Sequence, residues 1–320
     1  IKKNVESSKA ITKEIKYINV KSREDLSKLE EQVSLYVECS QENYHDGEII
    51  GVALSDSKNN YFISNSILEE VGDILKDKTI FTFDQKKNFV LLKKLGLELT
   101  VKDDLMIAAY LLNITSKDDI AYLMNSNDCE VAFYSQSLKD GFKKSDIVLK
   151  SRFIFDKRDY YVNSLEKEEM LSLYYDIEMP LVTVLANMEY DGVIVKQSIL
   201  EDMGKDMEER INELAHKIYE LAGEEFNISS PKQLGVILFE KLQLPYAKKT
   251  KTGYKTDVNI LNKLVNEHEI VGKILEYRGL TKIKSTYLDG LANYIREDGK
   301  IHTIYKQNLT RTGRLSSVEP

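Results

Sequence analysis

The sequence has 320 residues, of which 42% are hydrophobic and 30% charged, and a formal net charge of −7. This length predicts about two domains, and the composition indicates a soluble protein with ordinary hydrophobic cores. It excludes a membrane-spanning helix, because the longest apolar run, at residues 105–112, is far shorter than the ~18 residues that a bilayer requires.

The N-terminus and the cysteines bear on where the protein works. No N-terminal stretch has the apolar centre of a signal peptide. Cys39 and Cys129 are the only cysteines, too few for a disulfide framework, and the sequence lacks the paired Cys and His pattern of a zinc site. We therefore expect a cytoplasmic protein with no membrane partner. Because the chain begins with Ile and stops within a polar loop, we also expect a piece of a longer protein.

Charge is unevenly divided along the chain. Residues 231–320 hold 16 Lys and Arg against 9 Asp and Glu, a net charge of +7, whereas residues 1–230 carry −14. An acidic body with a basic C-terminal third is the asymmetry expected when one part binds a polyanion. A solvated basic surface is the alternative.

The first half of the chain alternates between predicted strands and helices. Three short β-rich stretches separated by polar turns predict a three-stranded meander, followed by a fourth strand and a helix that ends at Gly96. A second buried helix is predicted over 103–113, and residues 115–150 show a mixed pattern with helical stretches. The predicted strands are 33–40, 49–56, 60–65 and 79–84.

From about Leu171 the pattern becomes helical. A helix that stops at Gly192 is followed by a short strand. Apolar residues then recur at spacings of three and four from Ile199 to Leu221, which predicts one long amphipathic helix closed by Gly223.

A further helix has a clear start. Ser230 is its predicted N-cap, Pro231 occupies the first helical position, and Gln233 is the capping-box partner. The charged stretch at 160–172 is the predicted domain boundary, which divides the chain into residues 1–170 and 171–320.

The string TRTGRLSS, at residues 310–317, concentrates polar groups around a glycine. Arg311 and Arg314 provide two guanidinium groups, hydroxyl side chains surround them, and Gly313 allows close approach to the backbone. Such a set suits phosphate oxygens and the acceptors on base edges. The loop is therefore predicted to face a nucleic acid.

This string closely resembles the T-x-T-G-R-L-S-S-x-x-P motif of family A (DNA polymerase I-like) DNA polymerases. Residues 225–245 and 276–291 are similar to the thumb of these enzymes, and residues 35–46 with the strands after them resemble their 3′–5′ exonuclease domain. The resemblance implies an α/β ribonuclease H-like exonuclease domain, with a mixed sheet and helices, followed by a mostly α-helical polymerase thumb and the first palm residues. It also implies that the chain ends at the thumb–palm junction.

Whether such an exonuclease domain is active depends on its carboxylates, because two-metal phosphodiester hydrolysis needs them to hold two cations ~3.5–4 Å apart. Active family members supply an Asp-x-Glu on the first strand, an Asp on the next helix, and a Tyr-x-x-x-Asp on a later helix. The matching positions here are Tyr36 and Glu38, then Asn88, then Asp146 and Lys150 (or Ser151 if one gap is allowed).

With one of the carboxylates left and a lysine in place of another, this site is expected to hold no metal and to be a vestigial, inactive proofreading site. A second acidic set lies elsewhere, at Asp103, Asp104, Asp118 and Asp119. We interpret it as helix N-terminal acids and solvated surface rather than as metal ligands. The four histidines, His45, His216, His268 and His302, are scattered and are expected to be structural or solvated.

The resemblance also implies DNA-binding residues, each with a structural alternative. Thumb residues would grip duplex phosphates, although a solvated helix face is the commoner fate of such side chains. A residue at a helix N-terminus would contact phosphate or simply cap the helix. The lysine-rich loop 247–257 is expected to be a thumb tip near DNA. The candidate residues are Ser230, Lys232, Arg278, Lys282, Lys284, Ser285, Thr312 and Arg314.

The resemblance implies a segment of a DNA-directed DNA polymerase, a nucleotidyltransferase of DNA replication and repair. The parent would bind primer–template duplex DNA as a monomer and use Mg. In the family, the polymerase carboxylates and the dNTP-binding helix lie after the position of Pro320. The segment is therefore expected to have no cofactor and to meet dNTP only through the missing palm and fingers. Two alternatives remain open: an active metal-dependent 3′–5′ exonuclease, and a non-catalytic duplex-DNA-binding module.

Overall fold

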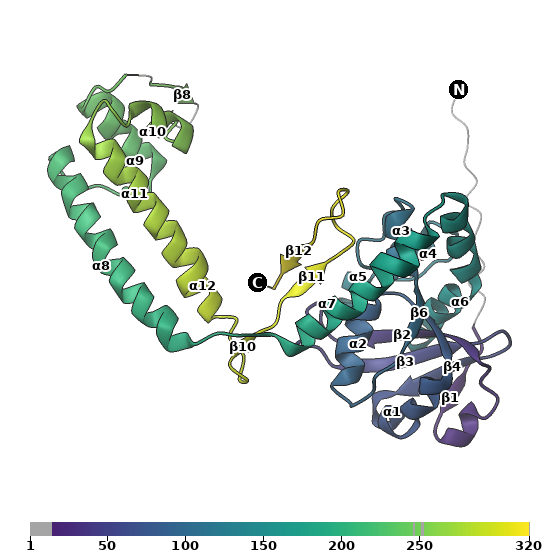
Figure 1. Cartoon of the computed structure of the whole chain (residues 1–320). Helices are drawn as coiled ribbons and strands as arrows, with labels where there is room; N and C mark the ends of the chain where they lie inside the picture. The colour runs from purple at the N-terminus through teal and green to yellow at the C-terminus, as the bar shows by residue number, and fades with distance from the viewer. Residues whose placement is uncertain (1–14, 246, 251–252, 320) are drawn as a thin grey trace, which may run out of the picture. The chain divides into compact units, whose positions relative to one another are not determined.

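The computed structural model describes residues 15–245, 247–250 and 253–319. The chain forms two compact units, each described here by itself (Figure 1). The first, the sheet unit, contains the chain up to Gly192 together with His302–Glu319, and the second, the helical unit, contains Val193–Ile301. Across the described residues, every helix is too short or too polar to cross a membrane.

A six-stranded mixed sheet forms the centre of the sheet unit, in the order β1-β4-β3-β2-β5-β6. The antiparallel β2–β3–β4 meander and the parallel strand β5 confirm the sequence prediction. Strands β1 and β6 were not predicted, because one is three residues long and the other, VKDD, lacks an alternating pattern. The strands are β1 Ile18–Val20, β2 Gln32–Cys39, β3 Ile49–Ser55, β4 Asn60–Ser64, β5 Thr79–Thr82 and β6 Val101–Asp104.

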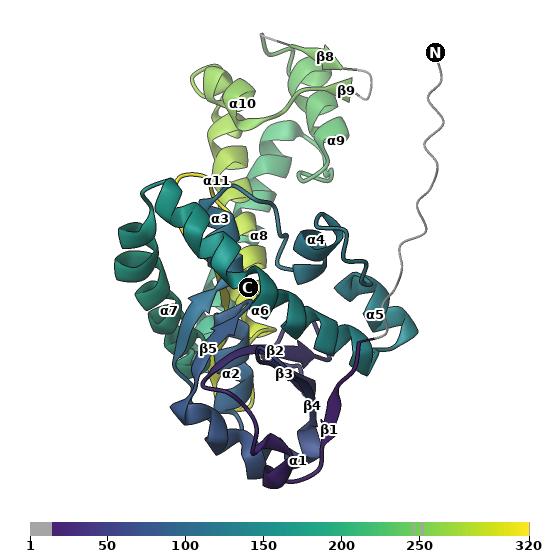
Figure 2. The same ribbon diagram turned by 90° about the vertical axis from the view of Figure 1, so that its right-hand side faces the viewer.

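Helices cover both faces of this sheet. Alternation along β2 directs Leu35 and Val37 to the face packed by α1 and α2, and Tyr36 to the opposite face, where α6 crosses β2 and β3 (Figure 2). Each face thus has its own hydrophobic core. The helices of this unit are α1 Asn65–Val71, α2 Gln85–Lys93, α3 Leu105–Leu111, α4 Ile120–Asn125, α5 Tyr134–Asp140, α6 Lys144–Lys167 and α7 Met179–Asp191.

The structural boundary lies later than the predicted one between residues 170 and 171. Helix α6 continues through most of the charged stretch, which is its solvent-facing end. After a π-helical stretch at Leu173–Glu178, α7 packs on α2 and buries Val182 and Leu185 in the sheet unit. The charged run therefore marks an exposed helix end rather than a linker, and the compact unit extends to Gly192.

The helical unit is built around α8, which pairs with α11 and confirms the predicted long amphipathic helix. Gly223 ends α8 in the left-handed conformation, with φ 74°, as the sequence predicts. Its elements are β7 Val193–Ile194, α8 Gln197–Ala222, α9 Pro231–Val236, β8 Lys249–Thr250, β9 Gly253–Tyr254, α10 Val258–Leu264, α11 Glu269–Ile283, α12 Asp289–Ala292 and β10 Lys300–Ile301.

The start of α9 matches the predicted cap only in part. The Ser230 hydroxyl accepts a hydrogen bond from the Gln233 N–H, at 3.4 Å. The Gln233 side chain, however, accepts from the Asn227 N–H rather than from Ser230. The Ser230 N–H is already donated to the Asn227 carbonyl, at 2.9 Å, so the reciprocal half of the capping box is wrong.

The C-terminal segment forms a hairpin in the sheet unit. Strand β11, Ile304–Lys306, pairs antiparallel with β12, Ser316–Val318, and Ile304 joins the core that contains Leu35. Residues 307–315, which include most of the TRTGRLSS string, form the loop between the two strands. We call them the TRTGR loop.

Candidate functional site

The residues that correspond to an exonuclease site form a buried ion pair. The Lys150 ammonium lies 2.6 Å from a Glu38 carboxylate oxygen, and each side chain is 1% exposed. The Tyr36 hydroxyl donates to Glu38 at 3.5 Å, and the Lys150 ammonium also lies 5.0 Å from the centre of the Tyr36 ring. Burial, and then the charge of Glu38, raise the pKa of Tyr36 well above its ordinary value.

The alternation along β2 and the crossing of α6 over it bring these side chains together. Tyr36 and Glu38 are two residues apart on β2 and so point to the same face of the sheet, the face that α6 crosses. The neighbouring Ser151 does not reach Glu38. Instead, its carbonyl accepts a hydrogen bond from the Ser34 hydroxyl, at 2.7 Å. The structure thus selects Lys150 over Ser151 as the residue opposite Glu38.

The other two exonuclease-type positions do not join this cluster by any hydrogen bond among the described residues. The Asn88 side chain is buried and donates to the Thr82 hydroxyl, at 2.7 Å, and to the Phe83 carbonyl. Asp146 lies in the first turn of α6, where the Ser145 hydroxyl donates to it. Nowhere in the described ranges do three His, Cys, Asp or Glu side chains gather as metal ligands would.

Asp103 and Asp104 are buried, so the expectation of solvated surface is wrong for both, whereas that of a helix N-terminal acid is confirmed for Asp104. Asp104 caps α3 and accepts hydrogen bonds from three backbone N–H groups, of Asp84, Gln85 and Met106. Burial raises its pKa to about 7. Asp103 accepts from the Arg158 guanidinium, at 2.8 Å. Asp104 therefore caps a helix, and Asp103 forms an ion pair.

Asp118 and Asp119 also have structural partners. Asp119 is the N-cap of α4, as expected for a helix N-terminal acid, and accepts from the Ala121 N–H. Asp118 accepts from Lys306, at 2.8 Å, and from Asn308, at 2.5 Å. The sequence did not reveal this contact with the C-terminal hairpin.

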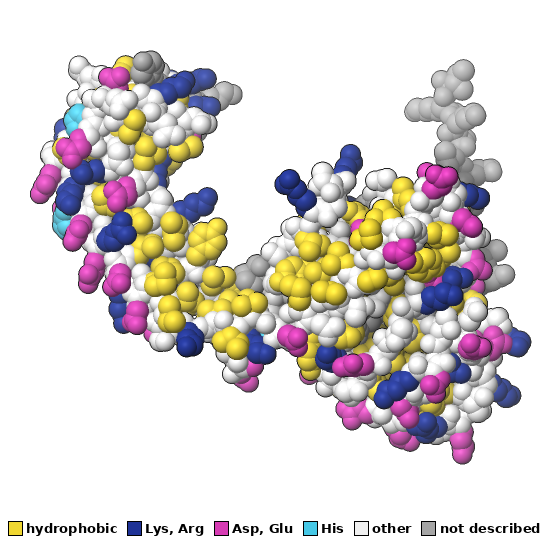
Figure 3. Space-filling view, viewed as in Figure 1, with side chains coloured by type: hydrophobic (Ala, Val, Ile, Leu, Met, Phe, Trp, Pro, Cys, Tyr) yellow, Lys and Arg dark blue, Asp and Glu magenta, His cyan; other side chains and the backbone are white. Residues whose placement is uncertain are grey.

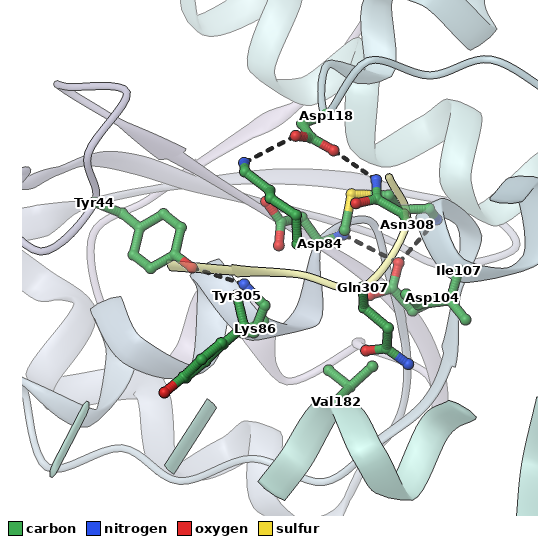
Figure 4. A pocket seen from close by; sticks show the side chains of 12 residues that line it. Tyr44, Asp84, Lys86, Asp104, Ile107, Asp118, Val182, Tyr305, Gln307 and Asn308 are labelled. Atoms are coloured by element: carbon green, nitrogen blue, oxygen red, sulfur yellow. Dashed lines mark hydrogen bonds and ion pairs between the residues drawn. The ribbon is translucent and has the colours of Figure 1, made fainter. Parts of the chain in front are cut away.

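A second buried ion pair, which the sequence analysis missed, holds α7 to α2, to the loop after β2 and to the hairpin. Glu189 is fully buried and accepts from Lys86, at 2.8 Å, from the Tyr44 hydroxyl, at 2.6 Å, and from the Tyr305 N–H, at 2.6 Å. Figure 4 shows Tyr44, Lys86 and Tyr305 beside one another. Glu189 lies on the apolar stripe of α7 that contains Val182 and Leu185. A charged residue on such a stripe indicates a buried ion pair, and this signal could have revealed the pair from the sequence.

Two of the histidines expected to be scattered lie together beside this pair. The rings of His45 and His302 are 5.4 Å apart between centroids, and the His302 Nδ1 lies 2.7 Å from the Glu189 carbonyl. His268 caps α11, where its Nδ1 accepts from the Ile270 N–H. These three side chains have structural partners, in agreement with the expected structural role.

The TRTGR loop presents its polar tip to solvent. Arg311, Thr312 and Arg314 are exposed, and Gly313 has a φ of 72°, a conformation that favours glycine. A hydrogen bond within the loop closes this turn, because the Thr310 hydroxyl donates to the Arg314 carbonyl, at 2.7 Å.

In the helical unit, some candidate DNA-binding side chains are bound by neighbouring residues, whereas others are exposed. The Arg278 guanidinium is part-buried and donates to the Thr256 carbonyl, at 2.5 Å. Lys284 pairs with Asp289, at 3.0 Å, and lies in a π-helical turn, Lys284–Leu288, rather than on the regular face of α11. Lys282 is exposed and forms no ion pair with any residue that the structure describes.

The remaining candidates lie on exposed or partly exposed surface. Ser285 donates to the Lys282 carbonyl, and Lys232 is exposed in the first turn of α9, next to the capping Ser230. Figure 3 shows Lys and Arg side chains on the exposed surface of both units. In the lysine-rich loop 247–257, residues 251 and 252 lie outside the described residues.

Two family profiles and several known proteins are similar to this chain. The family profile described as "DNA polymerase family A" matches residues 197–320, and the profile "DNA polymerase I, ribonuclease H-like domain" matches residues 35–138. The DNA polymerase I of Lactococcus lactis subsp. cremoris (strain MG1363) is 40% identical over 98% of this chain and 37% of its own length. That of Geobacillus stearothermophilus is 41% identical over 91% of this chain and 35% of its own.

A solved structure is similar over nearly the whole chain. It is described as the POL domain of Pol1 from M. smegmatis in complex with DNA primer-template and dNTP, and it matches with a TM-score of 0.77 and 29% identity. The match covers 93% of this chain and 53% of that one. The chain spans just over a third of the length of the curated relatives above. The mixed sheet with its helices is a ribonuclease H-like exonuclease domain, it is followed by a helical polymerase region, and the chain belongs to the family A DNA polymerases.

Proposed function

We propose that this chain is the exonuclease-like and thumb portion of a DNA-directed DNA polymerase that acts in the cytoplasm as a monomer, in DNA replication and repair. The observation that carries the proposal is the exposed TRTGR loop at the end of a segment, residues 197–320, that matches the polymerase family profile. The relative from M. smegmatis is described with DNA primer-template and dNTP, which supports primer–template DNA as the partner.

The chemistry of nucleotide addition belongs to the whole protein. Nucleotidyl transfer by this family uses Mg, which carboxylates hold against the phosphates of the dNTP. By the family resemblance, those carboxylates lie after Pro320. What the 320 residues contribute under this proposal is duplex binding by the helical unit and presentation of Thr312 and Arg314 by the TRTGR loop.

The exonuclease-like domain, in our proposal, does not hydrolyse DNA. The residues present do not fit a two-magnesium site, because Glu38 is already neutralised by Lys150 at 2.6 Å and Asn88 provides no charge. An ammonium at this position also repels a cation electrostatically. The domain would therefore serve as a scaffold.

Labelled single-stranded DNA and magnesium test whether the exonuclease-like domain is inactive. We expect the whole protein to release no nucleotides, and the Glu38→Ala variant to behave like the wild type. Magnesium-dependent release that disappears in Glu38→Ala would show an active exonuclease and overturn this part of the proposal.

Duplex binding is tested by comparing Lys282→Ala with Arg314→Ala in the whole protein. Lys282 is exposed and pairs with no acidic side chain among the described residues, so its removal should weaken binding to all duplex sequences alike. It should also reduce the slope of log affinity against log salt by about one. Arg314 is expected to contact base-edge acceptors that every base pair presents in the minor groove. Its removal should slow primer extension and alter mismatch sensitivity, with nearly unchanged affinity.

Lys167→Ala, at the exposed end of α6 in the sheet unit, is the matched lysine control and should change neither quantity. A wild-type protein that binds duplex but does not extend a primer would indicate a non-catalytic binding module. An Arg314→Ala variant that loses only affinity and salt slope would make Arg314 one more phosphate contact.

A further inference from the structure

Two carboxylates of the sheet unit hold the base of the TRTGR loop. Gln307 donates to the Glu178 carbonyl, at 3.1 Å, and to the Glu178 carboxylate, and Asp118 binds the residues on either side of Gln307. Asp118 accepts a hydrogen bond from Lys306, the last residue of β11, at 2.8 Å, and another from Asn308, at 2.5 Å. The donors lie 188 and 190 positions away in the sequence. Figure 4 shows the Asp118 carboxylate with Asn308 beside it. One side chain thus contacts the chain on both sides of Gln307.

The backbone that carries Asp118 is strained. Lys117 and Asp118 have φ values of 48° and 58°, so two consecutive residues other than glycine adopt the left-handed conformation. Such residues are uncommon and persist only where surrounding contacts enforce them. Asp119 provides such contacts, because its carboxylate accepts from the N–H groups of Ala121 and Tyr134. These contacts hold the turn that carries Asp118 toward the hairpin.

The rest of the loop is secured in the same region. The Tyr110 hydroxyl, at the end of α3, donates to the Thr310 carbonyl at 2.8 Å, and Thr310 in turn donates to the Arg314 carbonyl at 2.7 Å. Beyond these contacts, Arg311 and Thr312 are exposed. The backbone at the base of the loop is therefore fixed, and the polar side chains at its tip are exposed.

The charges agree with this arrangement. Burial by itself would raise the pKa of Asp118, but Lys306 and Asn308 outweigh it and the pKa is lowered. Asp118 is therefore ionised at neutral pH, the state that accepts both hydrogen bonds.

We propose that Asp118 is a positioning residue for the polymerase reaction: through Lys306 and Asn308 it fixes the base of the TRTGR loop, and so the place of Thr312 and Arg314, without touching DNA itself. This inference rests on the proposed function. It gives the exonuclease-like domain a task that needs no metal, namely to hold a polymerase loop in place.

The experiment compares Asp118→Ala and Asp118→Asn in the whole protein, with Asp128→Asn as the matched control. Asp128 is also an aspartate with a positive φ, 57°, in the same domain, but it is exposed. The first readout is the rate of tryptic cleavage after Arg311 and Arg314, which needs no polymerase activity. We expect it to rise about tenfold in Asp118→Ala, less in Asp118→Asn, and not in the control.

The second readout is single-turnover primer extension. A loop that is misplaced by about 1 Å should slow extension roughly 10- to 100-fold, while affinity for primer–template DNA stays within about twofold. The preference for matched over mismatched primer ends should fall as well. Lys306→Met should reproduce these effects in part, and the double variant Asp118→Ala/Lys306→Met should be no worse than Asp118→Ala.

The outcomes separate this inference from the proposed function. If the wild type neither binds duplex nor extends a primer, the proposed function fails, and the cleavage assay still tests the contact. If the wild type extends and the Asp118 variants match it in both readouts, the inference is wrong. The inference would also be overturned if the Asp118 variants were cleaved by trypsin throughout the protein and lost DNA affinity to the same extent as extension. Such a result would show that Asp118 has only a structural role.

Discussion

At the scale of single residues, the pair Glu38–Lys150 shows how a buried charge is tolerated. Both side chains are 1% exposed, and removing two charges from water costs several kcal/mol per ion. The direct contact at 2.6 Å and the hydrogen bond from Tyr36 offset that cost. Such a pair adds little stability as a whole, but the loss of one member leaves the other charge buried and unpaired.

Lys150→Met should therefore destabilise the sheet unit by about 3–5 kcal/mol. The double variant Glu38→Gln/Lys150→Met should recover a large part of this loss, because no charge then remains buried. Urea denaturation followed by circular dichroism measures both. Lys167→Met, at the exposed end of the same helix, is the control and should change stability by less than about 0.5 kcal/mol. Equal losses in the single and double variants would contradict the argument.

Asp104 leads to a prediction about pH. Burial raises its pKa to about 7, so between about pH 4 and 7 the folded protein keeps a proton that the unfolded chain releases. The contribution of this group to the free energy of unfolding therefore falls as pH rises through that window.

The Asp104→Asn variant does not titrate at this position. The stability of the wild type relative to Asp104→Asn should thus be greater near pH 4.5 than near pH 8, by about 1.4 kcal/mol for each unit of pKa difference. Chemical denaturation at the two pH values measures it, and the same comparison with Asp128→Asn should show no such trend. A difference that stays constant between the two pH values would mean that Asp104 is ionised throughout.

At the scale of the element, helix α11 combines a part-buried and an exposed cation one turn apart. Arg278 and Lys282 are four residues apart, which places them on the same side of the helix. Yet Arg278 is tied to Thr256, before α10, whereas Lys282 is exposed. The spacing that made both look like phosphate contacts does not distinguish them, because the difference depends on what packs beside the helix.

Arg278→Ala should therefore act mainly on stability. It removes hydrogen bonds from a charged donor to Thr256, worth about 1.5–3 kcal/mol, and should lower the unfolding free energy of the helical unit by that order. Lys282→Ala should leave stability within about 0.5 kcal/mol of the wild type. Thermal unfolding of the two variants tests this. The reverse order would show that the contact with Thr256 contributes nothing.

At the scale of the whole molecule, the two units have separate hydrophobic cores. Among the described residues, no member is shared between the two cores of the sheet unit and the core of the helical unit, which contains Leu238, Leu261 and Ile274. Each unit therefore has the burial that a cooperative folding unit requires.

We expect two unfolding transitions, each sensitive to its own core. Leu238→Ala should destabilise one by about 2–5 kcal/mol, and Leu54→Ala the other by a similar amount, because each leaves a cavity at a fully buried site. Denaturation monitored separately in each unit, for example by hydrogen exchange, assigns the transitions. One transition that shifts in both variants would mean that the units unfold together.

Much of the fold could be predicted from local signals in the sequence. The β-rich stretches and polar turns in residues 33–65 predicted β2, β3 and β4. The three- and four-residue spacing up to Leu221, closed by Gly223, predicted α8. These signals act within a few residues and need no partner. Strand β6 escaped because VKDD gains its strand character only by pairing with β5. The domain boundary escaped because a charged run marks an exposed surface, and both helix ends and linkers are exposed.

The sequence by itself determined the family, through the TRTGRLSS string, and its spacing pointed to Lys150 as a candidate position. Only the tertiary structure decided what those residues contact. The partners Glu38 and Lys150 are 112 positions apart, and Asp118 and Lys306 are 188 apart. Such pairs depend on which face of β2 meets α6 and on where the final hairpin packs. Sheet register and helix packing set these relations over the whole unit, so no short window of sequence contains them.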